Sequence, residues 1–214
     1  MQTTLRASDL TAATKYLADI DADLSDVLTR LGPPPLWKRP ATFATLVHIL
    51  LEQQVSLVSA MATFKRLNAA CQGRVTALRV RDLGQNSLRD LGFTRQKARY
   101  ATALAADVAT GRFRVGSLRH LPDDEAMSQI TRCLGFGAWS ANVFLLLALS
   151  RPDVLPLGDL ALIKGMHELD GGHYEEVDAL LARAEMWRPY RGVATRMIWQ
   201  LYLTNRNRLD EMLG

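Results

Sequence analysis

Two glycines in the pattern G-x-G, Gly135 and Gly137, lie between two stretches with helical hydrophobic spacing. Glycine lacks a Cβ, so the chain can turn sharply there and bring backbone N–H groups close to an external group. The second stretch begins at this turn and adds the unpaired N–H groups and partial positive charge of a helix N-terminus. Such a turn is suited to bind a phosphate. An ordinary tight connection between two helices would use the same residues, because an isolated G-x-G is a weak motif.

A carboxylate that could take part in chemistry follows at Asp159, eighteen residues after Ala141. The segment that begins at Gly158, GDLALIK, is typical of a helix start, where Asp is a favoured N-cap. A carboxylate can also stabilise positive charge or deprotonate water. Taken alone, the segment favours the cap. The two roles are compatible, because a cap would hold the carboxylate in one orientation.

Helices must position these groups, since no strand-like alternation of useful length occurs. The predicted helices are residues 8–20, 21–31, 42–52, 57–67, 78–91 (one short helix or two, with a turn at Gly84), 95–110, 125–133, 139–149, 159–169, 174–187 and 191–208. The predicted N-caps are Ser8, Thr42, Ser56 and Thr94. Residues 143–149 (VFLLLAL) are apolar on all sides, which predicts a central buried helix. The class is all-α.

The composition fits one globular domain, in one or two lobes: 214 residues, 48% hydrophobic and 22% charged. There is no run of 18 uncharged apolar residues and no signal-peptide pattern at the start, so neither a membrane span nor a secretory leader is expected. Two cysteines, Cys71 and Cys133, are too few for a disulfide framework and are predicted to be small buried residues.

The net charge of +4 is moderate, but the basic residues are clustered. Residues 183–208 contain six arginines but only one acidic residue, Glu185. The arginines are Arg183, Arg188, Arg191, Arg196, Arg206 and Arg208. A second cluster faces only Asp107: Arg95, Lys97, Arg99, Arg112 and Arg114. Such clusters suit a phosphate backbone or, equally, a solvated helix face. The four histidines (His48, His120, His167 and His173) have no metal-ligand spacing.

Four segments in order resemble one family. LGFGAWSAN, from Leu134, resembles the hairpin of the helix-hairpin-helix DNA glycosylases, in the 3-methyladenine DNA glycosylase II branch that removes alkylated bases. LPLGDLA, from Leu155, is similar to the family's catalytic-aspartate segment, and EQQVS, from Glu52, to its Q-Q-V-S loop. WRPYRGVA, from Trp187, together with Trp199 resembles its C-terminal W-x-P-[WY]-R-S-x-A segment.

The resemblance implies the helix-hairpin-helix glycosylase fold, with two helical lobes and the active site in the cleft between them. One lobe would comprise about 42–150, including the hairpin 134–139, and the other about 1–40 with 151–214. It also implies a base-excision repair enzyme that removes alkylated bases, such as 3-methyladenine and 7-methylguanine, from double-stranded DNA.

The expected chemistry is hydrolysis of a glycosidic bond through an oxocarbenium-like transition state. Ordinary glycosidases use two carboxylates, but an alkylated purine is already cationic and its departure needs little protonation. One carboxylate can then suffice to stabilise the sugar and to orient or deprotonate water. By resemblance, this catalytic residue is Asp159.

The base pocket is expected to include Trp139 and Trp199, which match family aromatics. A cationic base stacked on indole gains cation–π attraction, although core packing is the alternative for either tryptophan. Val143 stands where relatives carry a further aromatic, which predicts a wider or less stacking pocket. Relatives that also nick the strand have a lysine at position 139 for a Schiff base. Tryptophan there predicts a monofunctional enzyme.

Extruding a base leaves a gap that a wedge must fill. The loop alignment makes Gln54 the wedge candidate; the alternative is a helix-end glutamine bonded to backbone. Gly135, Gly137 and Ser140 are expected to grip a DNA phosphate, with a monovalent cation on hairpin carbonyls as an option. No other cofactor and no side-chain metal site are expected.

Two other functions stay open. One is a glycosylase of this fold with another lesion preference, and the other is a non-catalytic DNA-binding module. A monomer in the cytoplasm, nucleoid-associated in a bacterium, is expected.

Overall fold

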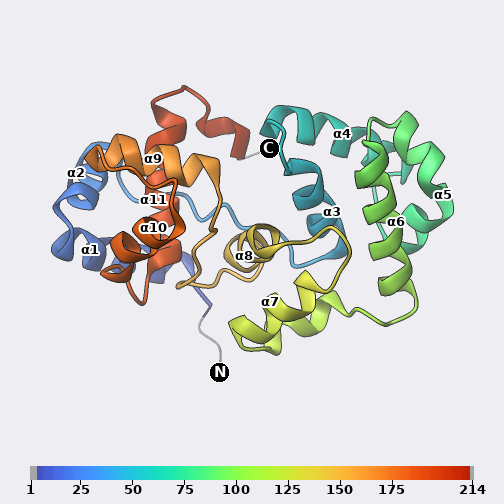
Figure 1. Ribbon diagram of the computed structural model, residues 1–214, viewed down its shortest axis with the longest axis horizontal. Coiled ribbons are helices and arrows are strands. Elements are labelled where there is room, and N and C mark those ends of the chain that lie inside the picture. The colour runs from blue at the N-terminus through green and yellow to red at the C-terminus, as the bar shows by residue number, and fades with distance from the viewer. Residues whose placement is uncertain (1–3, 213–214) are drawn as a thin grey trace. The chain divides into compact units, whose positions relative to one another are not determined.

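The computed structural model describes residues 4–212, and every regular element in this range is a helix (Figure 1). The α-helices are α1 (Ala7–Ile20), α2 (Ala22–Leu31), α3 (Phe43–Glu52), α4 (Leu57–Ala70), α5 (Ala77–Asp90), α6 (Arg95–Ala109), α7 (Asp123–Thr131), α8 (Ala138–Leu147), α9 (Leu160–Asp170), α10 (Val177–Glu185) and α11 (Arg191–Thr204). Two 3-10 helices are η1 (Val115–His120) and η2 (Leu209–Met212). The all-α prediction is confirmed. Within these residues, no helix has the length and hydropathy to cross a membrane.

The chain forms two compact units. The first unit comprises residues 4–38 and 145–212, which hold α1, α2, α9, α10 and α11. The second unit comprises residues 39–144, which hold α3 to α7. Helix α8 begins in the second unit, and its last three residues belong to the first.

Helix α11 is the centre of the first unit, where it packs against α1, α2 and α9. Its residues 192–201 are all buried. Helix α9 can approach closely because Gly165 has no side chain; a Cβ there would lie 2.6 Å from Cγ2 of Ile198. This buried helix carries Trp199 and holds it against the start of α9.

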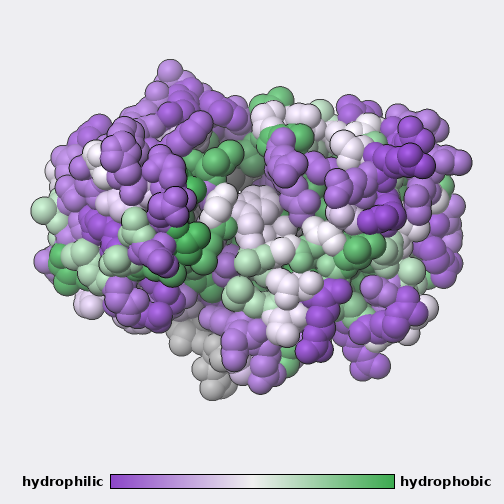
Figure 2. Space-filling model, in the orientation of Figure 1, coloured by the Kyte–Doolittle hydropathy of each residue, from purple (hydrophilic) through white to green (hydrophobic). Residues whose placement is uncertain are grey.

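In the second unit, α3 packs against α4 and α6, and α5 packs against α6. Helix α5 is kinked at Gly84, whose φ is 72°. Hydrophilic side chains cover much of α5 in the view of Figure 2. Residues 141–149 are all buried, so the predicted burial of the apolar run VFLLLAL is confirmed.

Local side chains set most of the helix starts. Thr42, Ser56 and Thr94 are the N-caps of α3, α4 and α6, as predicted, and each side-chain oxygen accepts a backbone N–H of the first turn. The predicted cap at Ser8 is wrong. The carboxylate of Asp9 accepts from the N–H of Arg6 at 2.9 Å, so α1 begins one residue earlier, at Ala7, and includes Ser8 in its first turn.

The last two predicted helices were too long. The predicted break at Gly171 and Gly172 is confirmed, but the loop extends through Tyr174, whose hydroxyl donates to the Asp170 carboxylate. Helix α10 therefore begins only at Val177. Helix α11 ends at Thr204, where turns replace the predicted continuation to Arg208.

Candidate functional site

Asp159 is the N-cap of α9 in the first unit. Its Oδ1 accepts the backbone N–H of Leu162 at 2.8 Å, which confirms the capping role. Gly158, with φ of 77°, turns the chain just before it. The side chain is 8% exposed. The carboxylate is therefore fixed in position at the positive end of a helix, where a negative charge is stabilised.

Trp199 is a second donor to the same carboxylate oxygen. Its indole Nε1–H donates to Oδ1 of Asp159 at 3.0 Å. Trp199 is buried in α11, so its ring cannot turn away without disturbing the core. The two donors, one from backbone and one from a rigid ring, leave the carboxylate little freedom to rotate. The sequence did not predict this hydrogen bond, because Trp199 and Asp159 are 40 residues apart in the chain.

Trp37 adds an aromatic residue that the sequence reasoning missed. Its ring lies 6.5 Å from that of Trp199, centroid to centroid, at an interplanar angle of 56°. It is buried, has a positive φ of 44°, and its indole N–H has no hydrogen-bond partner among the described residues. The one signal was a tryptophan just after the proline run of residues 33–35.

The segment before Asp159 is anchored to the start of α11. The Asp153 carboxylate accepts from the guanidinium groups of Arg191 at 2.9 Å and Arg188 at 3.1 Å. The N–H of Gly192 donates to the carbonyl of Pro152 at 2.8 Å, and a Cβ on Gly192 would lie only 2.8 Å from that oxygen. A glycine is needed there to let the two segments touch.

The arginines of residues 183–208 all have partners within the protein, although the side chain of Arg188 is 50% exposed. Arg183 binds Asp21, Asp23 and Asp170 at 2.7–3.1 Å. Arg206 pairs with Glu168, and Arg208 with Glu211. Arg196 is fully buried and donates to the carbonyls of Leu36 and Leu146. Burial lowers the pKa of Arg196 to about 10. Most of this positive charge stabilises the first unit.

The hairpin, residues 134–139, lies in the second unit and includes the end of the turn after α7 and the first two residues of α8. The Phe136 N–H donates to the Cys133 carbonyl at 3.1 Å and closes the turn. Gly135 has φ of 89°, and a Cβ on it would lie 2.1 Å from Cδ2 of Tyr100. Gly137 differs, because a Cβ there would meet no protein atom within 4 Å. Packing against Tyr100 therefore explains why residue 135 is a glycine, whereas no contact within the protein requires a glycine at residue 137.

Gln53 fastens the Q-Q-V-S loop to this hairpin, and sequence reasoning missed it. Its amide Nε2 donates to the carbonyl of Gly135 and to Oγ of Ser140, both at 2.9 Å. Ser140 is 2% exposed, so its hydroxyl is used inside the protein.

Gln54, the wedge candidate, is exposed and has φ of 59°. A left-handed conformation costs a residue other than glycine about 1–2 kcal/mol, and such strain is concentrated at functional sites. The preceding turn is held by Lys97, whose Nζ donates to the carbonyls of Leu51 at 2.8 Å and Gln53 at 2.7 Å.

The other predicted pocket residues lie in the second unit. Trp139 is partly exposed in the first turn of α8, and Val143, one turn later, is 3% exposed. Both cysteines are buried and free, as predicted. Burial raises the pKa of Cys133 to about 11, with a smaller contribution from Asp107, so the thiol beside the hairpin stays protonated near neutral pH.

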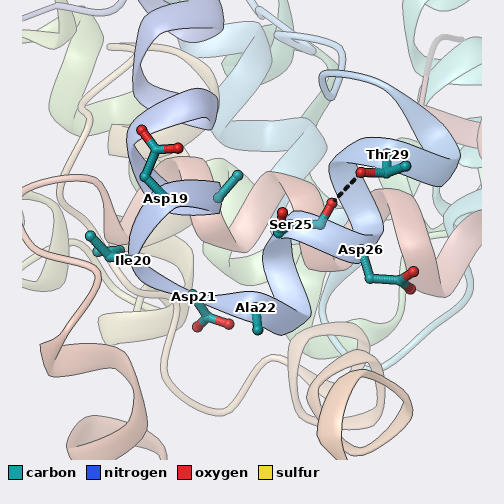
Figure 3. Close-up of a pocket in the computed structure, with 8 residues that line it drawn as sticks. Asp19, Ile20, Asp21, Ala22, Ser25, Asp26 and Thr29 are labelled. Atoms are coloured by element: carbon teal, nitrogen blue, oxygen red, sulfur yellow. Dashed lines mark hydrogen bonds between the residues drawn. The ribbon is translucent and has the colours of Figure 1, made fainter.

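Neither a metal-ligand cluster nor the hollow between α1 and α2 offers a further site among the described residues. No three His, Cys, Asp or Glu side chains within residues 4–212 are grouped to hold a metal ion. A hollow at the junction of α1 and α2 is lined by Asp19, Asp21 and Asp26 (Figure 3) and contains none of the predicted site residues. Its acidic lining would repel a phosphate.

Comparison with protein families matches residues 47–189 to the model described as HhH-GPD superfamily base excision DNA repair protein. DNA-3-methyladenine glycosylase 1 of Schizosaccharomyces pombe is 23% identical over 202 residues, which are 90% of this chain and 88% of that protein. The Bacillus subtilis protein YfjP is 31% identical over 124 residues, which are 56% of this chain but only 42% of YfjP.

Two solved structures share the fold. DNA-3-methyladenine glycosidase from Bacillus halodurans has a TM-score of 0.77 at 26% identity, and the alignment covers 94% of this chain and 95% of that one. Mag1 of Schizosaccharomyces pombe, solved in complex with abasic DNA, has a TM-score of 0.76 at 21% identity and covers 91% and 97%. The predicted helix-hairpin-helix glycosylase fold is confirmed. The family match extends over well more than half of the chain and includes Gln54, the hairpin and Asp159, so the chain belongs to the HhH-GPD superfamily of base excision DNA repair proteins.

Proposed function

We propose that this protein is a monofunctional DNA glycosylase that removes alkylated bases, such as 3-methyladenine and 7-methylguanine, from duplex DNA and leaves an abasic site. The observation that carries the proposal is the Asp159 carboxylate, held by the Leu162 N–H at 2.8 Å and the Trp199 indole at 3.0 Å. A fixed anion in a nearly buried position is suited to stabilise a developing positive charge, because it needs no reorganisation during the reaction.

In the proposed reaction, the C1′–N bond of the damaged nucleotide breaks and the sugar acquires oxocarbenium character. The leaving base carries its own positive charge from alkylation and becomes neutral as it takes the bonding electrons. Asp159 stabilises the sugar cation, and a water adds at C1′ and loses its proton to the carboxylate or to solvent. The products are the free base and an abasic sugar.

The absence of a strand-nicking step follows from the side chain at position 139. A Schiff base requires an amine at the reacting carbon, and Trp139 has none. Lys164, the next lysine after the hairpin, is exposed on α9, and Lys97 is bonded to two carbonyls. Cleavage of the sugar–phosphate chain is therefore left to later treatment or to another enzyme.

Binding to DNA is proposed to use the hairpin and the loop before α4. The space beside Gly137 and the N-terminus of α8 suit a phosphate, which contacts backbone N–H groups without reading sequence. Gln54 is proposed to enter the duplex as the base leaves it. The names of the relatives support alkylated bases as the lesion class.

The test is excision from duplex oligonucleotides that each carry one defined lesion, assayed with and without hot alkali. The proposal expects strand breaks only after alkali and only at alkylated bases. Breaks without alkali would contradict the monofunctional assignment. Excision confined to oxidised or deaminated bases would contradict the lesion class, and tight binding without excision of any lesion would favour the non-catalytic DNA-binding module.

A further inference from the structure

We propose that Gln53 and Lys97 are positioning residues that hold the wedge candidate Gln54 and the phosphate-binding hairpin in one rigid body. This inference rests on the proposed function and concerns the extrusion step that precedes bond cleavage. Neither residue is assigned a role by the chemistry described so far. All of the contacts that carry it lie within the second unit.

The first contact is at the end of α3. The last carbonyl groups of a helix have no partners inside it, and a cation at this end is stabilised by the helix dipole. Lys97, from α6, donates to two of these oxygens, on Leu51 and Gln53, at 2.8 and 2.7 Å. These two bonds direct the ammonium group toward the end of α3, and burial lowers the pKa of Lys97.

The second contact crosses from the loop to the hairpin. The amide of Gln53 donates one hydrogen bond to the Gly135 carbonyl and one to Ser140 Oγ, both at 2.9 Å. These acceptors lie on either side of Gly137, where the phosphate is proposed to bind. The two bonds therefore fix both ends of the turn that would hold the DNA backbone.

Gln54 is the residue after Gln53, whose side chain makes these two hydrogen bonds. Its φ of 59° directs the chain away from the helix, and its side chain is exposed. On the other side, Ser56 caps α4 through the N–H of Ser59 at 3.2 Å. Gln54 is thus an exposed residue, next to the exposed Val55, in a short loop whose two flanks are fixed.

A rigid connection matters because extrusion opposes two forces. The wedge must enter the base stack while the backbone is held nearby, and unstacking costs a few kcal/mol. If the loop could shift relative to the hairpin, restacking of the DNA bases would displace Gln54 from the duplex. Gln53 and Lys97 prevent that shift without touching the DNA or the reacting atoms.

The test compares Gln53→Met and Lys97→Met with the wild type on two substrates. In one, the lesion is paired with its normal partner base; in the other, it faces a tetrahydrofuran abasic analogue, so no base pair must be broken. The proposal expects at least a tenfold loss of single-turnover excision on the paired lesion and less than a threefold loss on the unpaired one. Gln85→Met, at an exposed position of α5, is the matched control and should leave both rates unchanged.

A structural role alone would lower both rates together, and that result, or no loss on either substrate, overturns the proposal. Thermal unfolding identifies a variant that fails to fold. In that case Ser140→Ala, which removes one of the two acceptors, should show the same preference for the unpaired substrate, and equal losses would again contradict the proposal.

A second readout does not need excision. With 2-aminopurine beside the lesion, saturating wild-type protein should raise the fluorescence, and Gln53→Met should lower that rise at equal occupancy. If the wild type extrudes the base but excises nothing, the proposed function fails and this inference is still tested. If the Gln53→Met rise equals that of the wild type, the positioning role is refuted while the proposed function stands.

Discussion

The indole N–H of Trp199 donates to the same Asp159 oxygen that caps α9, at 3.0 Å. Trp199, expected as a pocket wall or a core residue, is therefore also a hydrogen-bond donor to the proposed catalytic carboxylate. Its burial in α11 connects the packing of the first unit directly to the orientation of that group.

Trp199→Phe keeps an aromatic ring but removes this donor. A hydrogen bond to a charged group contributes about 1.5–3 kcal/mol, so we expect kcat to fall roughly 10- to 100-fold with a smaller change in KM. Trp187→Phe is the matched control, because its indole donates to Asp21 at 2.6 Å from a fully buried position. That change should lower the free energy of unfolding rather than kcat. The reverse pattern would show that Trp199 is only a packing residue.

Arg183 should be the most sensitive ion-pairing residue of the first unit. It binds Asp21, Asp23 and Asp170, and the Asp21 side chain is only 2% exposed. Breaking a buried pair typically costs about 3–5 kcal/mol, so Arg183→Met should lower the free energy of unfolding in urea by roughly 3 kcal/mol. Arg30→Met, which breaks an exposed pair with Asp26, should cost about 0.5 kcal/mol or less. Similar costs for both variants would contradict the assignment.

The same cluster predicts loss of stability in acid. Burial would raise the pKa of Asp21, but hydrogen bonds from Arg183, Trp187 and the Leu24 N–H outweigh it and bring the pKa below 3.8. A carboxylate whose folded pKa is depressed stabilises the fold above its ordinary pKa and loses this contribution as pH falls through the folded value. The free energy of unfolding should thus decrease as pH falls below about 4.

Asp21→Asn isolates this effect. The variant should be less stable at pH 6 but lose less stability between pH 5 and pH 2.5 than the wild type, as measured by urea unfolding at each pH. Parallel curves for the two proteins would show that Asp21 does not titrate in this window.

Substitutions of the two hairpin glycines should have different effects, one on the free energy of unfolding and the other on DNA affinity. Gly135→Ala places a methyl group 2.1 Å from the Tyr100 ring at φ of 89°, so it should destabilise the protein by about 2 kcal/mol or more. Gly137→Ala meets no protein atom within 4 Å and should leave the unfolding free energy nearly unchanged. Its methyl group would stand where the phosphate approaches, so duplex affinity at fixed salt should fall about tenfold. Unaltered affinity would refute the proposed phosphate contact.

Local patterns predicted what local residues decide. Thr42, Ser56, Thr94 and Asp159 cap helices because each side chain bonds an N–H within its own first turn. The prediction of Ser8 as an N-cap was wrong because the carboxylate of the neighbouring Asp9 accepts the Arg6 N–H, and α1 begins before Ser8.

Contacts between distant residues were out of reach of such patterns. The clustered arginines suggested phosphate binding, yet Arg183 finds Asp21 at a separation of 162 residues. The bond from Gln53 to Ser140 spans 87 residues and joins two motifs that the sequence places in order but not in contact. Neither the number of charged residues nor their spacing in the sequence indicates which distant residue the fold will bring into contact with each side chain.

The most direct test of the central claim is excision by Asp159→Asn beside the wild type, on a duplex with one alkylated base, with binding to the same duplex measured in parallel. Asparagine is as good an N-cap as aspartate, so the fold should be kept. Removing the charge should lower the single-turnover rate at least about 100-fold, with duplex affinity unchanged or higher because a negative group near the phosphates is gone. Full excision by the variant would contradict the account.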